Sequence, residues 1–242
     1  MRVALFMTCL VDGMMPGAAV ATVTVLERLG VTVEVPLLQT CCGEMHTNTG
    51  YGDRALPLVK RFADAFAGFD AVVTPSASCA GAVRHQHLAL AEQANDRGLI
   101  RLALESQAKT YELSEFLVDV LGVDDVGACY PHRVTYHPTC HALRVLRVGD
   151  RPLQLLRHVR ELQLVELPDA EVCCGFGGTF AIKNPDVSAA MLTDKVACIA
   201  DTGASVCAAG DASCMLHIGG GLSRAGAGAR MIHLAEILAS QR

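Results

Sequence analysis

The tripeptide Cys-Cys-Gly occurs twice in this sequence, at residues 41–43 and again at residues 173–175. In each half, one further cysteine precedes the pair and another follows it. The leading spacings are 32 and 33 positions, and the trailing spacings are 37 and 40. A long internal repeat implies two copies of one structural unit, so it limits the possible folds more than a single motif does. The repeat defines a first and a second quartet of thiols, which are Cys9, Cys41, Cys42, Cys79 and Cys140, Cys173, Cys174, Cys214.

Other parts of the chain repeat in the same order. Residues 2–9 reappear as residues 133–140, with Arg-Val at the start and Thr-Cys at the end of both segments. Near the C-terminus, residues 231–238 match residues 110–117 in their apolar positions and share leucine and glutamate. These landmarks predict an internal duplication. The expected half-domains are residues 1–125 and 126–242.

Strand-like and helix-like segments alternate along both halves. Short apolar runs predict strands at residues 2–8, 31–35, 70–74, 110–113, 134–137, 162–167 and 205–209. Apolar residues at helical spacing predict helices at residues 18–29, 53–67, 80–97, 114–121, 153–159 and 187–200. Strands that alternate with helices indicate parallel β-α-β units. The predicted fold class is therefore α/β, with two duplicated βα half-domains that have small parallel sheets and are related by a pseudo-two-fold axis.

The positions of the thiols predict two metal sites. The members of each quartet are expected beyond the carboxyl ends of parallel strands, which share one sheet edge, and ahead of helices whose N-termini favour thiolate over thiol. Four thiolates suit zinc and iron–sulfur clusters alike, whereas calcium and magnesium prefer oxygen ligands. Gly43 and Gly175 are expected to let the backbone turn sharply beside each cysteine pair.

The remaining cysteines and the nearby histidines carry weaker signals. Cys207 aligns with Val72 inside a predicted strand, which predicts a packing role. Cys129 and Cys198 have no counterpart in the other half and are also expected to be structural. Because none of the histidines near the quartets has a duplicated partner, a ligand role and a structural role both stay open. These histidines are His46, His137, His141 and His217.

The composition argues against several classes of function. The net charge is −5 and Lys and Arg form no run, which argues against a nucleic-acid or anionic membrane partner. No window reaches the roughly 18 to 20 apolar residues of a membrane span. The apolar N-terminal segment is itself duplicated, so we expect a cytoplasmic protein in which eleven cysteines serve metal or redox chemistry. The glycine-rich residues 175–178 fail the dinucleotide-binding motif because Phe180 replaces its last glycine.

These motifs resemble those of a known family. The duplicated Cys-Cys-Gly arrangement is similar to the CCG domain found in the cysteine-rich component of heterodisulfide reductase and in glycolate oxidase iron–sulfur subunits. A closer resemblance, over essentially the whole chain, is to the lactate utilization protein A family. It rests on residues 6–12, 109–113, 121–128 and 173–180.

The resemblance implies a cytoplasmic iron–sulfur subunit that transfers electrons in a complex oxidising L-lactate to pyruvate, with lactate utilization proteins B and C as partners. It implies that the two quartets ligate one or two [4Fe–4S] clusters, with zinc as the alternative. In the cysteine-rich component of heterodisulfide reductase a fifth cysteine completes each set, whereas Ala82 and His217 stand at those positions here. A zinc-stapled scaffold without a redox role and a disulfide-reductase-like catalytic subunit are the alternative functions.

Overall fold

Two four-stranded sheets form the framework of the computed structural model, which describes residues 1–241. All strand pairs in these sheets are parallel, and the strand orders are β2-β1-β3-β4 and β6-β5-β7-β8. The order is the same in both halves, which confirms the α/β fold class with duplicated half-domains. The strands are β1 (Val3–Leu5), β2 (Val33–Glu34), β3 (Ala71–Thr74), β4 (Thr110–Glu112), β5 (Arg133–Tyr136), β6 (Gln163–Val165), β7 (Val206–Ala209) and β8 (Arg230–His233).

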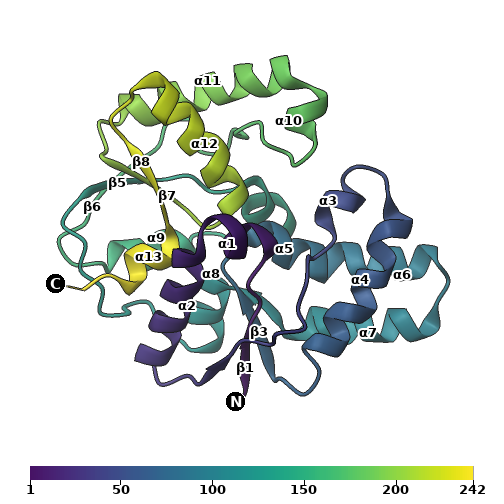
Figure 1. Cartoon of the computed structure of the whole chain (residues 1–242). Helices are drawn as coiled ribbons and strands as arrows, with labels where there is room; N and C mark the ends of the chain where they lie inside the picture. Colours follow the sequence, from purple (N-terminus) through teal and green to yellow (C-terminus); the bar gives the residue numbers. More distant parts are fainter. Residues whose placement is uncertain (242) are drawn as a thin grey trace.

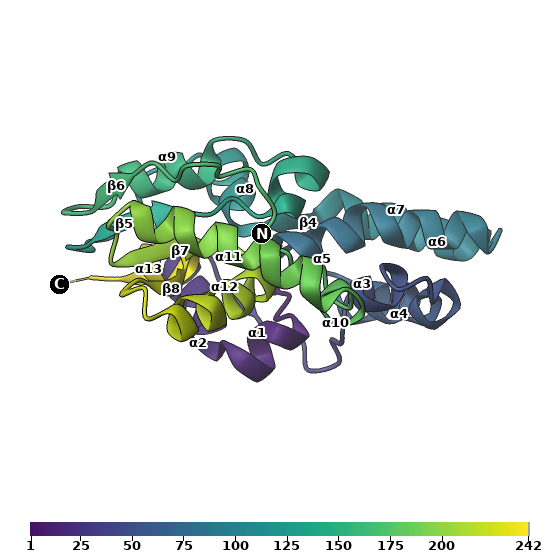
Figure 2. The ribbon, with the colours of Figure 1, turned by 90° about the horizontal axis from the view of Figure 1, so that it is seen from above.

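Helices connect the strands and flank the sheets (Figure 1). The α-helices are α1 (Cys9–Met14), α2 (Pro16–Arg28), α3 (Glu44–Thr47), α4 (Gly52–Ala65), α5 (Ala77–Gly81), α6 (His87–Gln93), α7 (Arg97–Lys109), α8 (Leu113–Glu115), α9 (Arg151–Arg157), α10 (Phe180–Lys183), α11 (Pro185–Asp201), α12 (Ala212–Ala225) and α13 (Leu234–Ala239). Three π-helical segments extend them, namely η1 (Ala82–Gln86), η2 (Phe116–Val120) and η3 (His141–Leu146). Helices α4, α6 and α7 form the end of the molecule that is remote from β5 and β6 (Figure 2).

The seven predicted strands are all present, and β8 is the counterpart of β4 that the C-terminal repeat indicated. The helix predicted over residues 80–97 is wrong in its extent, because Asn95 adopts a φ of 51° and separates α6 from α7. Asp96 then caps α7 by accepting hydrogen bonds from the backbone N–H groups of Gly98 and Leu99. An aspartate at this position satisfies donors that have no partner inside the helix.

One hydrophobic cluster joins the two halves. It contains Val3 and Val73 from the first sheet and Val134 and Val206 from the second. Helix α2, which follows β1, packs against α13, which follows β8. Helix α9, which follows β5, packs in the same way against α8, which follows β4. These exchanged pairs are the arrangement that a pseudo-two-fold axis between the halves produces.

Arg28 adds hydrogen bonds to this contact between the halves. The guanidinium of Arg28, at the end of α2, donates hydrogen bonds to the carbonyls of Val126, Leu238 and Ala239 at 3.1, 3.0 and 2.5 Å. Two of these carbonyls belong to α13 and the third to the segment that links the halves. Within residues 1–241, none of the helices has the length and apolar character needed to cross a bilayer.

Candidate metal centre

The eight quartet cysteines lie at the carboxyl ends of the strands in both sheets. Cys9 begins α1, and the first Cys-Cys pair lies in the loop after β2. Cys140 immediately precedes η3, and the second pair lies in the long loop after β6. Cys79 and Cys214 are the third residues of α5 and α12, so they lie inside helical first turns, whereas the sequence predicted them ahead of the helices.

The first quartet brings its four sulfur atoms together. The Sγ atoms of Cys42 and Cys79 are 3.3 Å apart, and those of Cys9 and Cys41 are 4.0 Å apart. The thiols of Cys41 and Cys42 also interact, which connects the two pairs. Cys42 and Cys79 are buried, whereas Cys9 is exposed. The quartet therefore has a dry inner side and a side that opens to solvent.

The second quartet is arranged in the same way. Cys173 interacts with the thiols of Cys140 and Cys174, and Cys174 interacts with that of Cys214. Cys174 and Cys214 are buried, and Cys140 and Cys173 are half-buried. The structure thus brings together each of the two quartets that the repeat defined, while the binding of a metal by them stays a prediction.

The two glycines of the repeated tripeptides have the predicted role. Gly43 and Gly175 both adopt a φ of 91°, a backbone conformation that favours glycine. This turn directs the backbone N–H of Gly43 at the Sγ of Cys41 and that of Gly175 at the Sγ of Cys173, both at 3.4 Å. Each N–H supplies a hydrogen-bond donor that stabilises a thiolate.

The thiols in each quartet do not share negative charge equally. Hydrogen bonds from Cys42 and Cys9, with that of the Gly43 N–H, hold the pKa of Cys41 far below its ordinary value. The same contacts act on Cys173, where the thiols of Cys140 and Cys174 lower its pKa. Cys9 and Cys140 donate their thiol protons to Cys41 and Cys173, and this hydrogen bond, together with burial, raises the pKa values of Cys9 and Cys140. A cation that takes the place of these protons would satisfy all the sulfurs at once.

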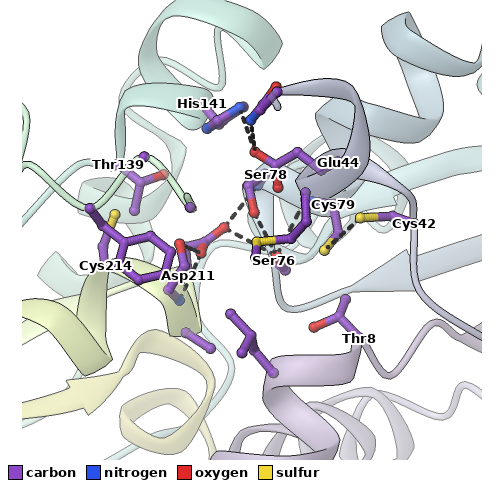
Figure 3. A pocket seen from close by; sticks show the side chains of 18 of the residues that line it. Thr8, Cys42, Glu44, Ser76, Ser78, Cys79, Thr139, His141, Asp211 and Cys214 are labelled. Carbon is purple, nitrogen blue, oxygen red and sulfur yellow. Dashed lines mark hydrogen bonds and ion pairs between the residues drawn. The ribbon is translucent and has the colours of Figure 1, made fainter. Parts of the chain in front are cut away.

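Both quartets line one cavity of about 150 Å³ between the halves. Figure 3 shows its wall, with Cys42 and Cys79 on one side and Cys214 on the other. Met45 and Phe176 supply apolar surface to it, and residues from both halves supply polar groups. The cavity therefore places the two groups of sulfur donors at a common space.

Asp211 connects the two cysteine-bearing helices across this cavity. Its Oδ2 accepts hydrogen bonds from the N–H of Ser78, in α5, at 2.8 Å and from the hydroxyl of Ser76, the N-cap of α5, at 3.1 Å. Its Oδ1 accepts from the N–H of Ser213 at 3.0 Å, which caps α12. Asp211 was not among the residues predicted from sequence. The repeat aligns it with Ser76 of the first half, which gives its place in the fold but not its partners across the cavity.

Glu44 is a second residue that sequence reasoning missed. It follows the first Cys-Cys-Gly directly, and its carboxylate lies 3.0 Å from the Nε2 of His141, the residue after Cys140 (Figure 3). Desolvation opposes the charged imidazole, but the hydrogen bond and charge of Glu44 give a net increase in the pKa of His141. The pair links the first cysteine loop to the second quartet. In the second repeat the position of Glu44 is taken by Phe176, so comparison of the halves gave no signal.

The four histidines near the quartets differ in their surroundings. His46 is exposed, and the Nε2 of His217 lies 3.4 Å from the hydroxyl of Ser188. His137 is buried, and neither ring nitrogen has a hydrogen-bond partner within residues 1–241. One of its nitrogens lies within 4.8 Å of the sulfurs of Cys174 and Cys214. Burial, followed by the charge of Lys195, lowers the pKa of His137 to about 4, which keeps its ring neutral.

The donor set fits a metal that prefers sulfur. Each quartet offers four thiol sulfurs, its inner members are buried, and glycine N–H groups point at one sulfur of each set. Such donors suit zinc or an iron–sulfur cluster and not a hard cation.

The remaining cysteines lie outside the quartets. Cys207 is fully buried in β7, as its alignment with Val72 predicted, and Cys129 is buried beside the Arg160 backbone.

Comparison with known proteins gives first the broad domain family of this chain and then a narrower family within it. A family model described as a cysteine-rich domain, CCG, matches residues 3–84 and 134–219, so the chain belongs to the CCG-domain family. Curated relatives then define the particular family. Proteins named lactate utilization protein A from Geobacillus kaustophilus (strain HTA426) and Bacillus velezensis (strain DSM 23117 / BGSC 10A6 / LMG 26770 / FZB42) are 46% and 44% identical to this chain. The alignments cover 98% of both chains in the first case and 100% of both in the second. The chain is a member of the lactate utilization protein A family.

Among the solved structures that match this chain, one covers most of it with low similarity. It is an aspartate racemase homologue from Pyrococcus horikoshii OT3, with 11% identity, coverage of 98% of this chain and 95% of that chain, and a TM-score of 0.33. A score this low carries no argument about the site.

Proposed function

We propose that this chain is a cytoplasmic electron-transfer subunit in the oxidation of L-lactate to pyruvate. The name shared by its relatives supports a role in lactate utilization. The observation that carries the redox part is the single cavity lined by both quartets. Two redox groups that face one cavity are well arranged to exchange electrons with each other.

The groups that we assign to the quartets are [4Fe–4S] clusters. When bound, such a cluster accepts and releases one electron at a time. The chain's own part is to hold the cluster by cysteine sulfurs and to adjust its potential. The N–H groups of Gly43 and Gly175 stabilise negative charge on sulfur, and the burial of Cys42 and Cys174 excludes water.

The partners that we propose are lactate utilization proteins B and C. The relatives' shared name supports a system of several proteins. Cys9 is exposed, so a partner that docks on this side would approach the first quartet directly. In this proposal the chemistry on lactate itself takes place on a partner, and the present chain carries electrons.

Anaerobic reconstitution tests the proposal. The protein should take up iron and sulfide in equal amounts, become brown and give an EPR signal after reduction. Mixed with proteins B and C, it should then pass electrons from L-lactate to an artificial acceptor. A protein that takes up no iron and transfers no electrons when the partners are present would contradict the proposal.

A zinc-stapled scaffold is the second candidate function. It is favoured by the four-sulfur donor set, which matches structural zinc sites. A zinc-loaded, colourless protein that assembles proteins B and C would support it. The disulfide-reductase-like alternative calls for a fifth thiol in each half, and this chain has Ala82 and His217 at those positions. Ala82 is buried within η1, and His217 faces Ser188.

A further inference from the structure

His137 and Phe6 occupy equivalent positions in the two halves, and the difference between them makes the two quartets unequal. Each residue stands three positions before the first cysteine of its quartet and directly follows a central strand. Both side chains are buried, at 0% exposure for Phe6 and 1% for His137. The first quartet therefore has an aromatic hydrocarbon beneath it, whereas the second has an imidazole.

Phe6 is well accommodated in the first half. Its ring packs edge-to-face on Phe62 and Phe66, with ring centroids 5.1 and 5.5 Å away. These contacts form an apolar floor with Cys42 and Cys79. In the first half this position needs no polar partner.

His137 lacks the partners that a buried imidazole requires. In the part of the chain that the structure describes, both Nδ1 and Nε2 are buried and without a hydrogen bond, in contrast to the Nε2 of His87, which contacts the carbonyl of Cys42 at 2.8 Å. A buried polar group without a partner is costly and calls for an explanation. The nearest functional atoms are sulfurs, because one ring nitrogen lies within 4.8 Å of the Sγ atoms of Cys174 and Cys214. This spacing matches ligands that share one metal ion.

The surroundings of His137 favour its use as a donor atom. Neither ring nitrogen is engaged by another group of residues 1–241, so one of them can offer its lone pair to a metal. Neutral imidazole nitrogen is a common ligand of both zinc and iron.

We propose that His137 supplies an imidazole nitrogen to the metal group of the second quartet, so that this site has a mixed sulfur and nitrogen donor set, whereas the equivalent residue of the first half, Phe6, offers no donor atom. The inference rests on the proposed function only in requiring that the second quartet binds metal. Its consequence is a division of roles. Histidine ligation raises the reduction potential of an iron–sulfur group relative to all-cysteine ligation, so electrons would pass from the first site to the second.

The test is spectroscopic and uses the full-length protein labelled with ¹⁵N-histidine. After anaerobic reconstitution with iron and sulfide, pulsed EPR of the reduced protein should show a directly bonded histidine nitrogen. If the sites take zinc instead, X-ray absorption should show a nitrogen neighbour in addition to sulfur. The nitrogen signal should disappear in His137→Phe, which copies the first half, and in His137→Gln. It should persist in His217→Phe, a matched change beside the same quartet.

The outcomes separate this inference from the proposed function. Metal bound without any nitrogen signal in the unsubstituted protein, or a signal that survives in His137→Phe and His137→Gln, would overturn the role of His137 and leave the proposed function intact. Loss of the signal in His217→Phe alone would also overturn it. A protein that binds no metal would overturn both. The measurement on the unsubstituted protein decides the question even if both His137 variants fail to fold.

Discussion

At the scale of single residues, the sulfur atoms of each quartet stabilise one another only through shared protons, and a metal would replace those protons. Metal binding and folding are therefore coupled. We expect Cys42→Ala or Cys174→Ala to lower metal content and thermal stability together, because a ligand present at about 1,000 times its Kd stabilises the folded state by about 4 kcal/mol. Metal analysis and calorimetry on the same samples would measure both quantities.

The matched control is Cys207→Val, a buried cysteine outside the quartets. This change keeps an apolar side chain of similar size, so it should alter stability by less than about 1.5 kcal/mol and leave metal content unchanged. If Cys42→Ala and Cys174→Ala both matched this control in melting temperature and metal content, occupancy of the quartets would be refuted.

Glu112 predicts a pH dependence of stability. Burial, the largest effect, raises its pKa from an ordinary value of 4.5 to about 7, although Ser114 donates hydrogen bonds to it. The folded state therefore binds more protons than the unfolded state between these pH values, and stability falls as the pH rises through this range. Relative to Glu112→Gln, the unsubstituted protein should lose about 3 kcal/mol between pH 4.5 and 7. Urea unfolding of both proteins at several pH values would measure this loss. A stability difference between them that stays constant with pH would refute the prediction.

At the scale of elements, the sequence predicted what periodicity and repetition encode. Continuous apolar runs marked β1, β3 and β7, and the repeat placed the four sulfurs of each quartet at one sheet edge. Short helices such as α1 and α3 were missed because six or four residues are too few to show a helical periodicity. Asp211 and Glu44 were missed for a different reason. Their partners lie in the other half, and a sequence repeat shows what the halves share and not how they face each other.

Two features of the structure disfavour a side chain at position 175, namely the positive φ of Gly175 and the close approach of helix α11. A Cβ there would lie 2.7 Å from the Ser188 carbonyl oxygen and 2.9 Å from the Met191 Cβ, both on α11, at a φ of 91°. We expect Gly175→Ala to destabilise the protein by about 3 kcal/mol through strain and overpacking. Gly50→Ala has a similar φ of 88° and open space around it, so it should cost only about 1 kcal/mol. Equal losses in urea unfolding would show that contact with α11 has no effect.

At the scale of the whole molecule, Arg28 holds the halves together through three carbonyls. Replacement by methionine keeps much of the apolar stem but leaves these acceptors without their donor. We expect Arg28→Met to lower the free energy of unfolding by about 2 kcal/mol. Arg101→Met on the exposed face of α7 removes only a 3.8 Å surface ion pair and should change stability by less than about 1 kcal/mol. Similar losses in chemical unfolding of the two variants would contradict a specific role for Arg28.

The two half-domains, proposed at residues 1–125 and 126–242, share their largest hydrophobic cluster, so neither should fold alone. Separation would expose the buried face of α2, which includes Val25 and Leu26, and the matching face of α13, which includes Leu234. We expect each half, expressed by itself, to show no cooperative thermal transition by circular dichroism. Mixing the two should restore one, because the largest hydrophobic cluster and the cavity are completed only by the contact between halves. An isolated half that melted cooperatively and bound metal would show that the duplicated unit is independent and that the common cavity is not needed to build a site.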